Sequence, residues 1–234
     1  MHHLIQKTRQ DYNKIAQHFS GTRYDVWPEL EQFKPLIKDG QRILDWGCGN
    51  GRLLLLIGER AAHYVGVDQS IELLKIARHK HLLAIKAGRA RFYSTARREK
   101  KFPSNYFDLV FMVASFHHLP DSASRLALLK KVQQELKPEG KLVITVWNLS
   151  STWARQVLQK KGWHQIGKQD FLIPWKDNRT GKVIVERYYH HCTPTEMRGL
   201  LKEAGFKVIR LGYGPGVKTS ERKGRNLIVV ATKK

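Results

Sequence analysis

Three alternating glycines and the acid ahead of them form the part of the sequence best suited to hold a cofactor. The run Asp-Trp-Gly-Cys-Gly-Asn-Gly places Asp45 just ahead of Gly47, Gly49 and Gly51. Glycine lets the backbone approach a ligand closely and adopt conformations that a side chain would forbid. A carboxylate beside this loop would repel a pyrophosphate but attract an ammonium or sulfonium group. The loop therefore predicts a cofactor that carries a positively charged group.

A second acid, Asp68, ends the next apolar run, seventeen residues after Gly51. A carboxylate at the end of a neighbouring strand can accept two hydrogen bonds from a ribose diol. The glycine spacing is GxGxG, whereas nicotinamide-dependent dehydrogenases have GxGxxG. The loop and the two acids together favour a nucleoside cofactor over a dinucleotide.

Apolar runs alternate with amphipathic helices along most of the chain, and these elements must position the loop and its acids. We expect strands at residues 42–45, 63–67, 91–94, 107–113, 141–146, 207–211 and 226–231. We expect one helix to end near residue 21, another to begin at 28, further helices at 51–60, 70–80, 122–136 and 194–204, and a turn at 137–140. Apolar strands that alternate with helices are typical of a doubly wound, mostly parallel α/β sheet.

A single domain is expected over residues 1–234. Its parts are an N-terminal helical cap (1–40), a cofactor-binding core (41–147), a substrate-side insertion (148–190) and a C-terminal helix with two strands (191–234). The insertion breaks the alternation with polar, basic and aromatic residues. We expect it to cover the carboxyl edge of the sheet, where open α/β sheets bind their ligands.

The chain is strongly basic, with 42 Lys and Arg against 20 Asp and Glu and a net charge of +22. An excess on this scale predicts a polyanionic partner such as a nucleic acid. The aliphatic runs are far shorter than the ~20 residues of a membrane span, and residues 1–19 lack the apolar core of a signal peptide. Two cysteines, Cys48 and Cys192, exclude a disulfide framework and a Cys-rich zinc site. We therefore expect a cytoplasmic protein with no membrane partner.

The glycine loop and three later regions strongly resemble the motifs of class I S-adenosylmethionine-dependent methyltransferases. Residues 43–51 are similar to motif I, 65–70 to the second motif, 107–110 with 115–119 to the fourth, and 136–142 to the turn before strand five. The resemblance implies a seven-stranded Rossmann-like sheet with an antiparallel C-terminal strand, and S-adenosyl-L-methionine as cofactor. It places at the cofactor Asp45, Gly47, Cys48, Gly49, Gly51, Asp68, Gln69, Ser70, Thr95, Ala96, Val113 and Ala114.

The sequence departs from this family at one position. The family often carries an acid after strand three that binds the adenine amino group, where this chain has Ser94-Thr95-Ala96-Arg97. We expect Thr95 or a backbone group to take that role.

Two flanking regions resemble a narrower family, the tRNA wobble-uridine carboxymethyl methyltransferases. They are the stretch from Tyr12 to Pro28 and the segments 170–176, 186–190 and 224–227. Enzymes of that family make a methyl ester from 5-carboxymethyluridine at the wobble position, and eukaryotic members work with a small zinc-binding activator subunit. The resemblance therefore implies the anticodon stem-loop of tRNA as partner, and such an activator as a possible second one. A carboxylate is already ionised at neutral pH, so the transfer needs no base and catalysis reduces to positioning.

Arginines and aromatic residues are the candidates for holding the acceptor. Arg23 and Arg187 could bind the substrate carboxylate in a bidentate manner. Trp147 and either Tyr188 or Tyr189 could stack on the base. The alternatives are structural salt bridges for the arginines and ordinary core packing for the aromatic residues.

Further candidates lie near the ends of strands and in the basic segments. His117 or His118 could line the substrate pocket, or could simply serve the start of a helix. Lys176, His190 and Asn226 lie in the segments that resemble the tRNA-modifying family, and we expect them at the substrate. The RNA phosphates would be met by Arg97, Arg98, Lys100, Lys101, Arg222, Lys223 and Arg225.

No metal site is expected. The His117–His118 pair lacks a third ligand, and adjacent ligands in His190-His191-Cys192 would diverge on a strand. Two other functions remain open. One is a small-molecule O- or C-methyltransferase with a basic surface, which would act without RNA. The other is a non-catalytic RNA-binding module on a methyltransferase fold, which would not bind the cofactor.

Overall fold

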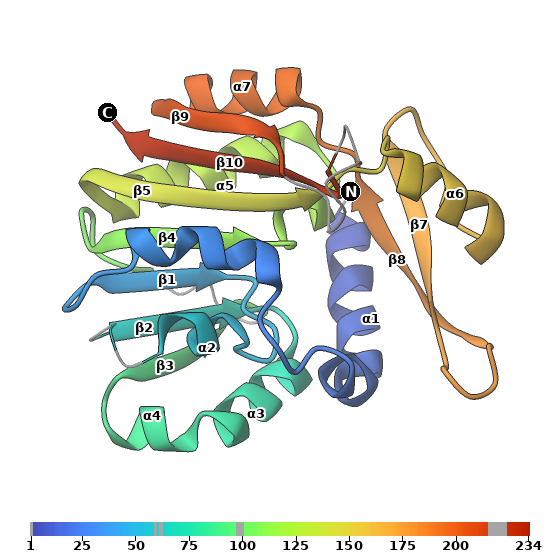
Figure 1. The fold of residues 1–234 in the computed structure, drawn as a ribbon, viewed down its shortest axis with the longest axis horizontal. Coiled ribbons are helices and arrows are strands. Elements are labelled where there is room, and N and C mark those ends of the chain that lie inside the picture. Colours follow the sequence, from blue (N-terminus) through green and yellow to red (C-terminus); the bar gives the residue numbers. More distant parts are fainter. Residues whose placement is uncertain (1, 59, 61–62, 97–100, 215–223) are drawn as a thin grey trace.

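A seven-stranded sheet forms the centre of the molecule (Figure 1). The computed structural model describes residues 2–58, 60, 63–96, 101–214 and 224–234. The strand order is β3-β2-β1-β4-β5-β10-β9. The strands are β1 Arg42–Trp46, β2 His63–Asp68, β3 Ala90–Ser94, β4 Phe107–Val113, β5 Leu136–Trp147, β9 Phe206–Tyr213 and β10 Asn226–Lys233. β1 to β5 pair in parallel and β10 is antiparallel to both of its neighbours, which confirms the predicted fold class.

Helices cover both faces of this sheet, which is why its inner strands are apolar on both sides. Leu129 of α5 and Leu201 of α7 are fully buried against one face, and Phe33 of η1 and Leu74 of α3 against the other. The helices are η1 Pro28–Leu36, α2 Leu53–Ile57, α3 Ile71–Lys80, α4 Leu82–Lys86, η2 Phe116–His118, α5 Ser122–Glu135 and α7 Pro194–Glu203. Among the residues that the structure describes, no helix is long and apolar enough to cross a membrane.

Two local features differ from the expected elements. Helix α2 spans only Leu53–Ile57, because Gly51 still belongs to a turn and Gly58, with φ +61°, ends the helix. The expected turn at 137–140 is a bulge inside β5, because the pairing with β4 jumps from Phe107↔Leu136 to Leu109↔Lys141. The turn residues therefore interrupt the register without ending the strand.

The segment after β5 forms a second, smaller sheet beside the main one. It contains α6 Thr152–Lys161, β6 His164–Gln165, β7 Asp170–Lys176 and β8 Val183–His190. The three strands are antiparallel, in the order β6-β7-β8. The N-terminal helix α1, His2–Gly21, lies between this sheet and the carboxyl ends of the parallel strands (Figure 1). This arrangement encloses space above the glycine loop.

Candidate active site

A cavity of about 440 Å³ lies where the carboxyl ends of β1, β2, β4 and β5 meet α1 and β8. This volume lies within the range of ~300–1,000 Å³ that is typical of pockets for small-molecule ligands. Most of the residues predicted at the cofactor line it, namely Asp45, Gly47, Cys48, Gly49, Asp68, Gln69, Thr95, Ala96, Val113 and Ala114. Both halves of the predicted chemistry, the acids and the glycines, thus border one cavity.

The glycine loop turns its bare backbone toward the cavity. Gly47 has φ +79°, and a Cβ atom there would lie 2.3 Å from the Cβ atom of Ser115. Gly49 has φ +56°, and its N–H donates to Oδ2 of Asp68 at 2.8 Å. No side chain fits at Gly47, so the loop can form only with glycine at this point.

Gly51 and Ser70 do not line the cavity, in contrast to our expectation. A Cβ atom on Gly51, where φ is +76°, would lie 2.8 Å from the ring of His81. The Ser70 hydroxyl accepts a hydrogen bond from Leu73 N, which caps α3, and donates to Oδ1 of Asn13 at 2.8 Å. Gly51 thus leaves room for the ring of His81, and Ser70 joins the start of α3 to α1.

The carboxylate of Asp45 is buried in the cavity wall, and no basic group of the described ranges is in direct contact with it. Its Oδ2 accepts a hydrogen bond from the Tyr64 hydroxyl at 2.7 Å, and the residue is 2% exposed. Burial raises the pKa of Asp45 to about 7, against the lowering effects of Tyr64 and Arg52. A cationic ligand beside a buried carboxylate with a raised pKa would stabilise its ionised form.

Asp68 is held by the loop that it faces. Its Oδ1 accepts from Ser70 N at 2.7 Å and its Oδ2 from Gly49 N at 2.8 Å. Burial raises the pKa of Asp68, and these backbone donors partly offset that effect. Each oxygen keeps a further lone pair, so the carboxylate can still accept hydrogen bonds from a diol.

Four arginines, Arg9, Arg23, Arg52 and Arg187, line the cavity together with Asp45 and Asp68. Nη1 of Arg9 donates to the carbonyl of Ala96 at 3.1 Å, and both residues belong to the cavity lining. This excess of positive charge is typical of a pocket that receives an anion.

Arg187 is the most deeply buried of these arginines, at 4% exposure. Its Nη1 donates to the Tyr12 hydroxyl at 3.3 Å, whereas its Nε has no hydrogen-bond partner among the described residues. Its guanidinium lies over the rings of Trp175, at 4.7 Å, and Tyr189, at 5.2 Å. The nearby acid Asp11 is ion-paired with Lys7 at 2.7 Å. The Nε edge of Arg187 is therefore a buried donor without an acceptor in the described part of the chain.

Tyr12 and His118 hold Arg187 through a directed chain of hydrogen bonds. Nδ1 of His118 lies 2.7 Å from the carbonyl of Tyr188, which can only accept, so Nδ1 carries the proton. Burial lowers the pKa of His118 to about 3, so the ring is neutral and its Nε2 accepts from the Tyr12 hydroxyl at 2.9 Å. The Tyr12 oxygen then accepts from Nη1 of Arg187.

His118, and not His117, lines the cavity. His117 is 1% exposed, and its Nδ1 accepts from Trp147 N at 3.3 Å. Burial lowers its pKa well below the usual range. Of the two histidines that the sequence offers for the substrate pocket, His117 instead packs its ring against Tyr189, at 4.6 Å between centroids. Trp147 and Tyr189 do line the cavity and stack on each other at 5.0 Å with 27° between their planes.

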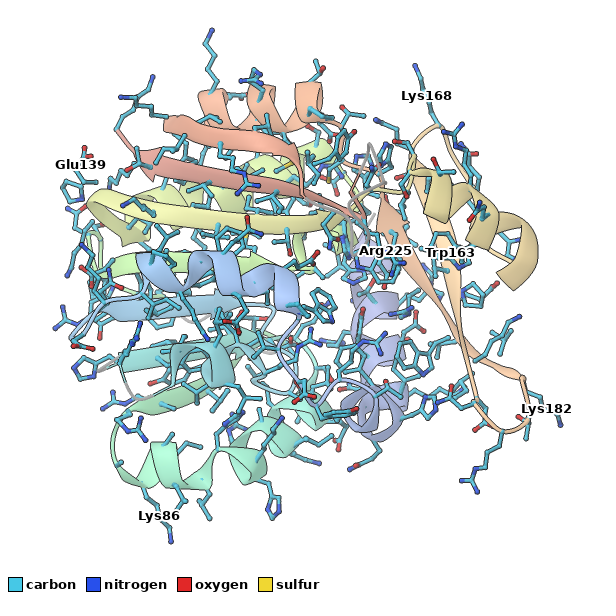
Figure 2. All side chains as sticks on the ribbon, viewed as in Figure 1. Lys86, Glu139, Trp163, Lys168, Lys182 and Arg225 are labelled. Atoms are coloured by element: carbon cyan, nitrogen blue, oxygen red, sulfur yellow. The ribbon has the colours of Figure 1, made fainter. Side chains whose placement is uncertain are left out.

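Several other predicted residues lie outside the cavity lining. Tyr188 is buried and its hydroxyl donates to Asp170, and Asn226 donates to Glu29. Lys101 and Lys176 are exposed. Arg225 lies at the end of the main sheet that faces the insertion (Figure 2), and its carbonyl accepts from Asn148 N at 2.8 Å. The remaining predicted RNA contacts, Arg97, Arg98, Lys100, Arg222 and Lys223, lie outside the described residues.

His190 belongs to a buried cluster with two acids, and both of its ring nitrogens are engaged there. Its Nδ1 lies 2.8 Å from Asp170 and its Nε2 3.0 Å from Glu196, which also contacts Arg125 at 3.1 Å. Both ring nitrogens of His190 thus face carboxylate oxygens in this cluster. Cys192 completes a group of three potential metal ligands with His190 and Glu196. The ion pairs already satisfy the two charged members, and the cluster joins β8 to α7 and α5.

We expect His190→Gln to lower the free energy of unfolding by about 2–4 kcal/mol, because His190 is the group that bridges the carboxylates of Asp170 and Glu196. Urea unfolding checks this value. The neighbouring His191→Gln is the matched control and should cost less than about 1 kcal/mol. Equal losses in the two variants would show that the cluster does not stabilise the fold.

Sequence reasoning missed Arg9, Tyr12 and Arg52 as cavity residues. Tyr12 lies on the apolar face of α1, where an aromatic ring is expected to pack in the core. The sequence pattern therefore gives no indication that its hydroxyl has a role. Arg52 directly follows the glycine loop, and this position in the sequence could have predicted that it borders the cavity.

The fold is that of S-adenosylmethionine-dependent methyltransferases. A protein of that description from Methanosarcina mazei superimposes with a TM-score of 0.66 over 89% of this chain and 98% of its own, at 23% identity. The chain solved with the Trm112 methyltransferase activator of Haloferax volcanii has a TM-score of 0.64 over 94% of this chain and 96% of its own, at 14% identity.

The chain belongs to the methyltransferase domain family, whose model matches residues 16–211. It is 29% identical to the tRNA (carboxymethyluridine(34)-5-O)-methyltransferase of Schizosaccharomyces pombe, over 87% of this chain and 90% of that protein. Relatives of the same name can be longer, and the chain spans 54% of the one from Saccharomyces cerevisiae, at 29% identity over 70% of this chain. The protein is thus an S-adenosylmethionine-dependent methyltransferase.

Proposed function

We propose that this protein methylates the carboxylate of 5-carboxymethyluridine at the wobble position of tRNA. The observation that carries the proposal is Arg187, a buried guanidinium that lines the cavity and contacts no acid among the described residues. A guanidinium offers parallel N–H donors that match the two oxygens of a planar carboxylate. The name of the Schizosaccharomyces pombe relative supports the same acceptor.

The cofactor half of the cavity fits S-adenosylmethionine, which supplies a methyl group on a cationic sulfur. Asp45 would face positive charge, because its buried carboxylate has no cation in direct contact among the described residues. The backbone at Gly47 and Gly49 would lie against the ligand, since no side chain intervenes there. Asp68 would accept from the ribose diol, and Thr95 lines the side where the family often has an acid.

The acceptor half positions an anion and needs no base. Arg187 would hold the carboxylate by one edge, and Trp147 with Tyr189 would border the base. The neutral His118 cannot attract the anion, so its role is to orient Tyr12 and, through it, Arg187. Orientation of this kind converts a bimolecular encounter into an in-line displacement.

The test uses purified protein, methyl-labelled S-adenosylmethionine and a synthetic anticodon stem-loop with 5-carboxymethyluridine at the wobble position. Label that transfers to this RNA and leaves as methanol after mild alkali supports the proposal. Transfer to the same stem-loop with unmodified uridine, or label that survives alkali, would contradict the ester. Turnover of small carboxylic acids without RNA would favour a small-molecule methyltransferase.

The partners that we propose are cytoplasmic tRNA and a small zinc-binding activator subunit. The net charge of +22 supports the first, and the shared fold with the Trm112-bound chain supports the search for the second. If the chain alone binds donor and RNA but does not turn over, addition of a Trm112-type protein should restore transfer. Full activity of the chain alone would remove the need for that partner.

We expect Tyr12→Phe to lower kcat/KM by about 10- to 100-fold, because a hydrogen bond to a charged group contributes about 1.5–3 kcal/mol. The change removes the acceptor of Arg187 Nη1 and the donor to His118. Steady-state kinetics on the modified stem-loop measures it. Tyr24→Phe, at a residue that is 64% exposed, is the matched control and should act like the wild type. Loss of S-adenosylmethionine affinity in Tyr12→Phe would instead indicate a disturbed fold.

A further inference from the structure

The hairpin of β7 and β8 ends in a basic tip away from the main sheet (Figure 1). Lys176, Arg179 and Lys182 are exposed there, and Figure 2 shows Lys182 at the outer end of the hairpin. None of the three forms an ion pair within the described ranges of the chain. Nothing in the chemistry of the cavity requires positive charge at this distance.

The tip is a formed loop. Asp177, its one acid, accepts hydrogen bonds from Arg179 N at 3.0 Å and from Thr180 N at 2.7 Å and Oγ1 at 3.0 Å. These bonds lower the pKa of Asp177 and occupy its carboxylate within the loop. Gly181, with φ +70°, donates to the carbonyl of Asp177 and closes the turn. The three cations are therefore presented on a preorganised loop, which reduces the entropy lost on binding.

The same two strands carry the acceptor-binding residues at their inner end. Trp175, which lies under both Arg187 and Arg23, is followed directly by Lys176. Arg187 and Lys182 are on β8 and its turn, five residues apart, a span of about 17 Å along an extended strand. A chain molecule whose reactive unit enters the cavity would thus have its neighbouring units beside the tip.

We infer that this hairpin is an arm that binds the phosphate backbone of the RNA near the nucleotide in the cavity. The acids of the two strands do not oppose this role, because Asp170 pairs with His190, and Glu186 lies 3.7 Å from His164. Exposed cations on a preformed turn suit phosphate groups, because phosphate contacts need positive charge and do not read the base sequence. The inference rests on the proposed function, since it takes RNA as the substrate.

The test measures binding alone, without donor or turnover. A fluorescent anticodon stem-loop is titrated with wild-type protein and with the triple variant Lys176→Gln/Arg179→Gln/Lys182→Gln over a range of salt concentrations. Three lost phosphate contacts should raise Kd by at least about tenfold near physiological salt, and reduce the slope of log Kd against log salt by about 2. S-adenosylmethionine binding should remain unchanged in the variant, which also checks its folding.

The matched control removes three charges elsewhere, in Lys86→Gln/Lys202→Gln/Lys207→Gln. These lysines are exposed on α4, α7 and β9, which line neither the cavity nor the hairpin. A smaller slope change in this control than in the hairpin variant would support the arm. Equal slope changes in the two variants would show that only net charge matters, and would overturn the inference. It would also be overturned if the hairpin substitutions weakened binding to anionic phospholipid vesicles but left binding to the stem-loop unchanged. Wild-type protein without affinity for the stem-loop would instead contradict the proposed RNA substrate.

Discussion

Replacement of Arg187 by alanine is expected to lower kcat/KM on the carboxymethylated stem-loop by about 10²–10³-fold. The reason is the loss of two charge-assisted hydrogen bonds to the carboxylate in a buried site. The loss should fall mainly on KM, because the carboxylate gives up its negative charge as it accepts the methyl group. An interaction that is stronger in the ground state than in the transition state does not raise kcat.

Two variants separate this role from a structural one. Arg187→Lys keeps the charge but not the fork, and should recover about a tenth of the lost efficiency or more. Arg187→Met should keep or raise the free energy of unfolding, because a buried guanidinium that contacts no acid in the described part of the chain is costly to desolvate. Arg198→Ala, at an exposed position of α7, is the control and should leave kinetics unchanged. Wild-type KM in Arg187→Ala would show that the carboxylate binds elsewhere.

The second large effect concerns pH and Asp45. The pKa of Asp45 is raised to about 7 in the free protein, so the carboxyl is mostly neutral below pH 7 and ionised above it. A cationic ligand binds the ionised form, and the apparent Kd scales with the inverse of that fraction. Affinity for S-adenosylmethionine should therefore fall about tenfold for each pH unit below 7 and level off above about 8.

Isothermal titration from pH 5.5 to 8.5 measures this profile. Asp45→Asn should bind more weakly, by about 100-fold above pH 8, and should lose the dependence on pH. Tyr64→Phe provides the sharper check, because the Tyr64 hydrogen bond lowers the pKa of Asp45. Its removal should move the midpoint of the profile to higher pH. A midpoint that stays in place would show that another group titrates.

The sequence by itself was sufficient for the sheet and for the glycine loop beside Asp45. A strand, a glycine turn and the following acid are local features, so Asp45, Gly47 and Asp68 lie together in any fold that forms parallel β1 and β2. Apolar strands such as Phe107–Val113 need cover on both faces, which the alternating helices provide. These parts follow from residues close to one another along the chain.

The surroundings of Arg187 were decided by tertiary structure. Arg187 meets Tyr12 only because α1 packs on β8, and those residues are 175 positions apart. Neighbours such as His117 and His118 point to different sides, so packing determines which of them borders the cavity. The same holds along β8, where Tyr189 lines the cavity and His190 turns to a buried ion cluster. Residue type shows what a side chain can do, whereas the register of its strand and the element packed against it decide which groups it meets.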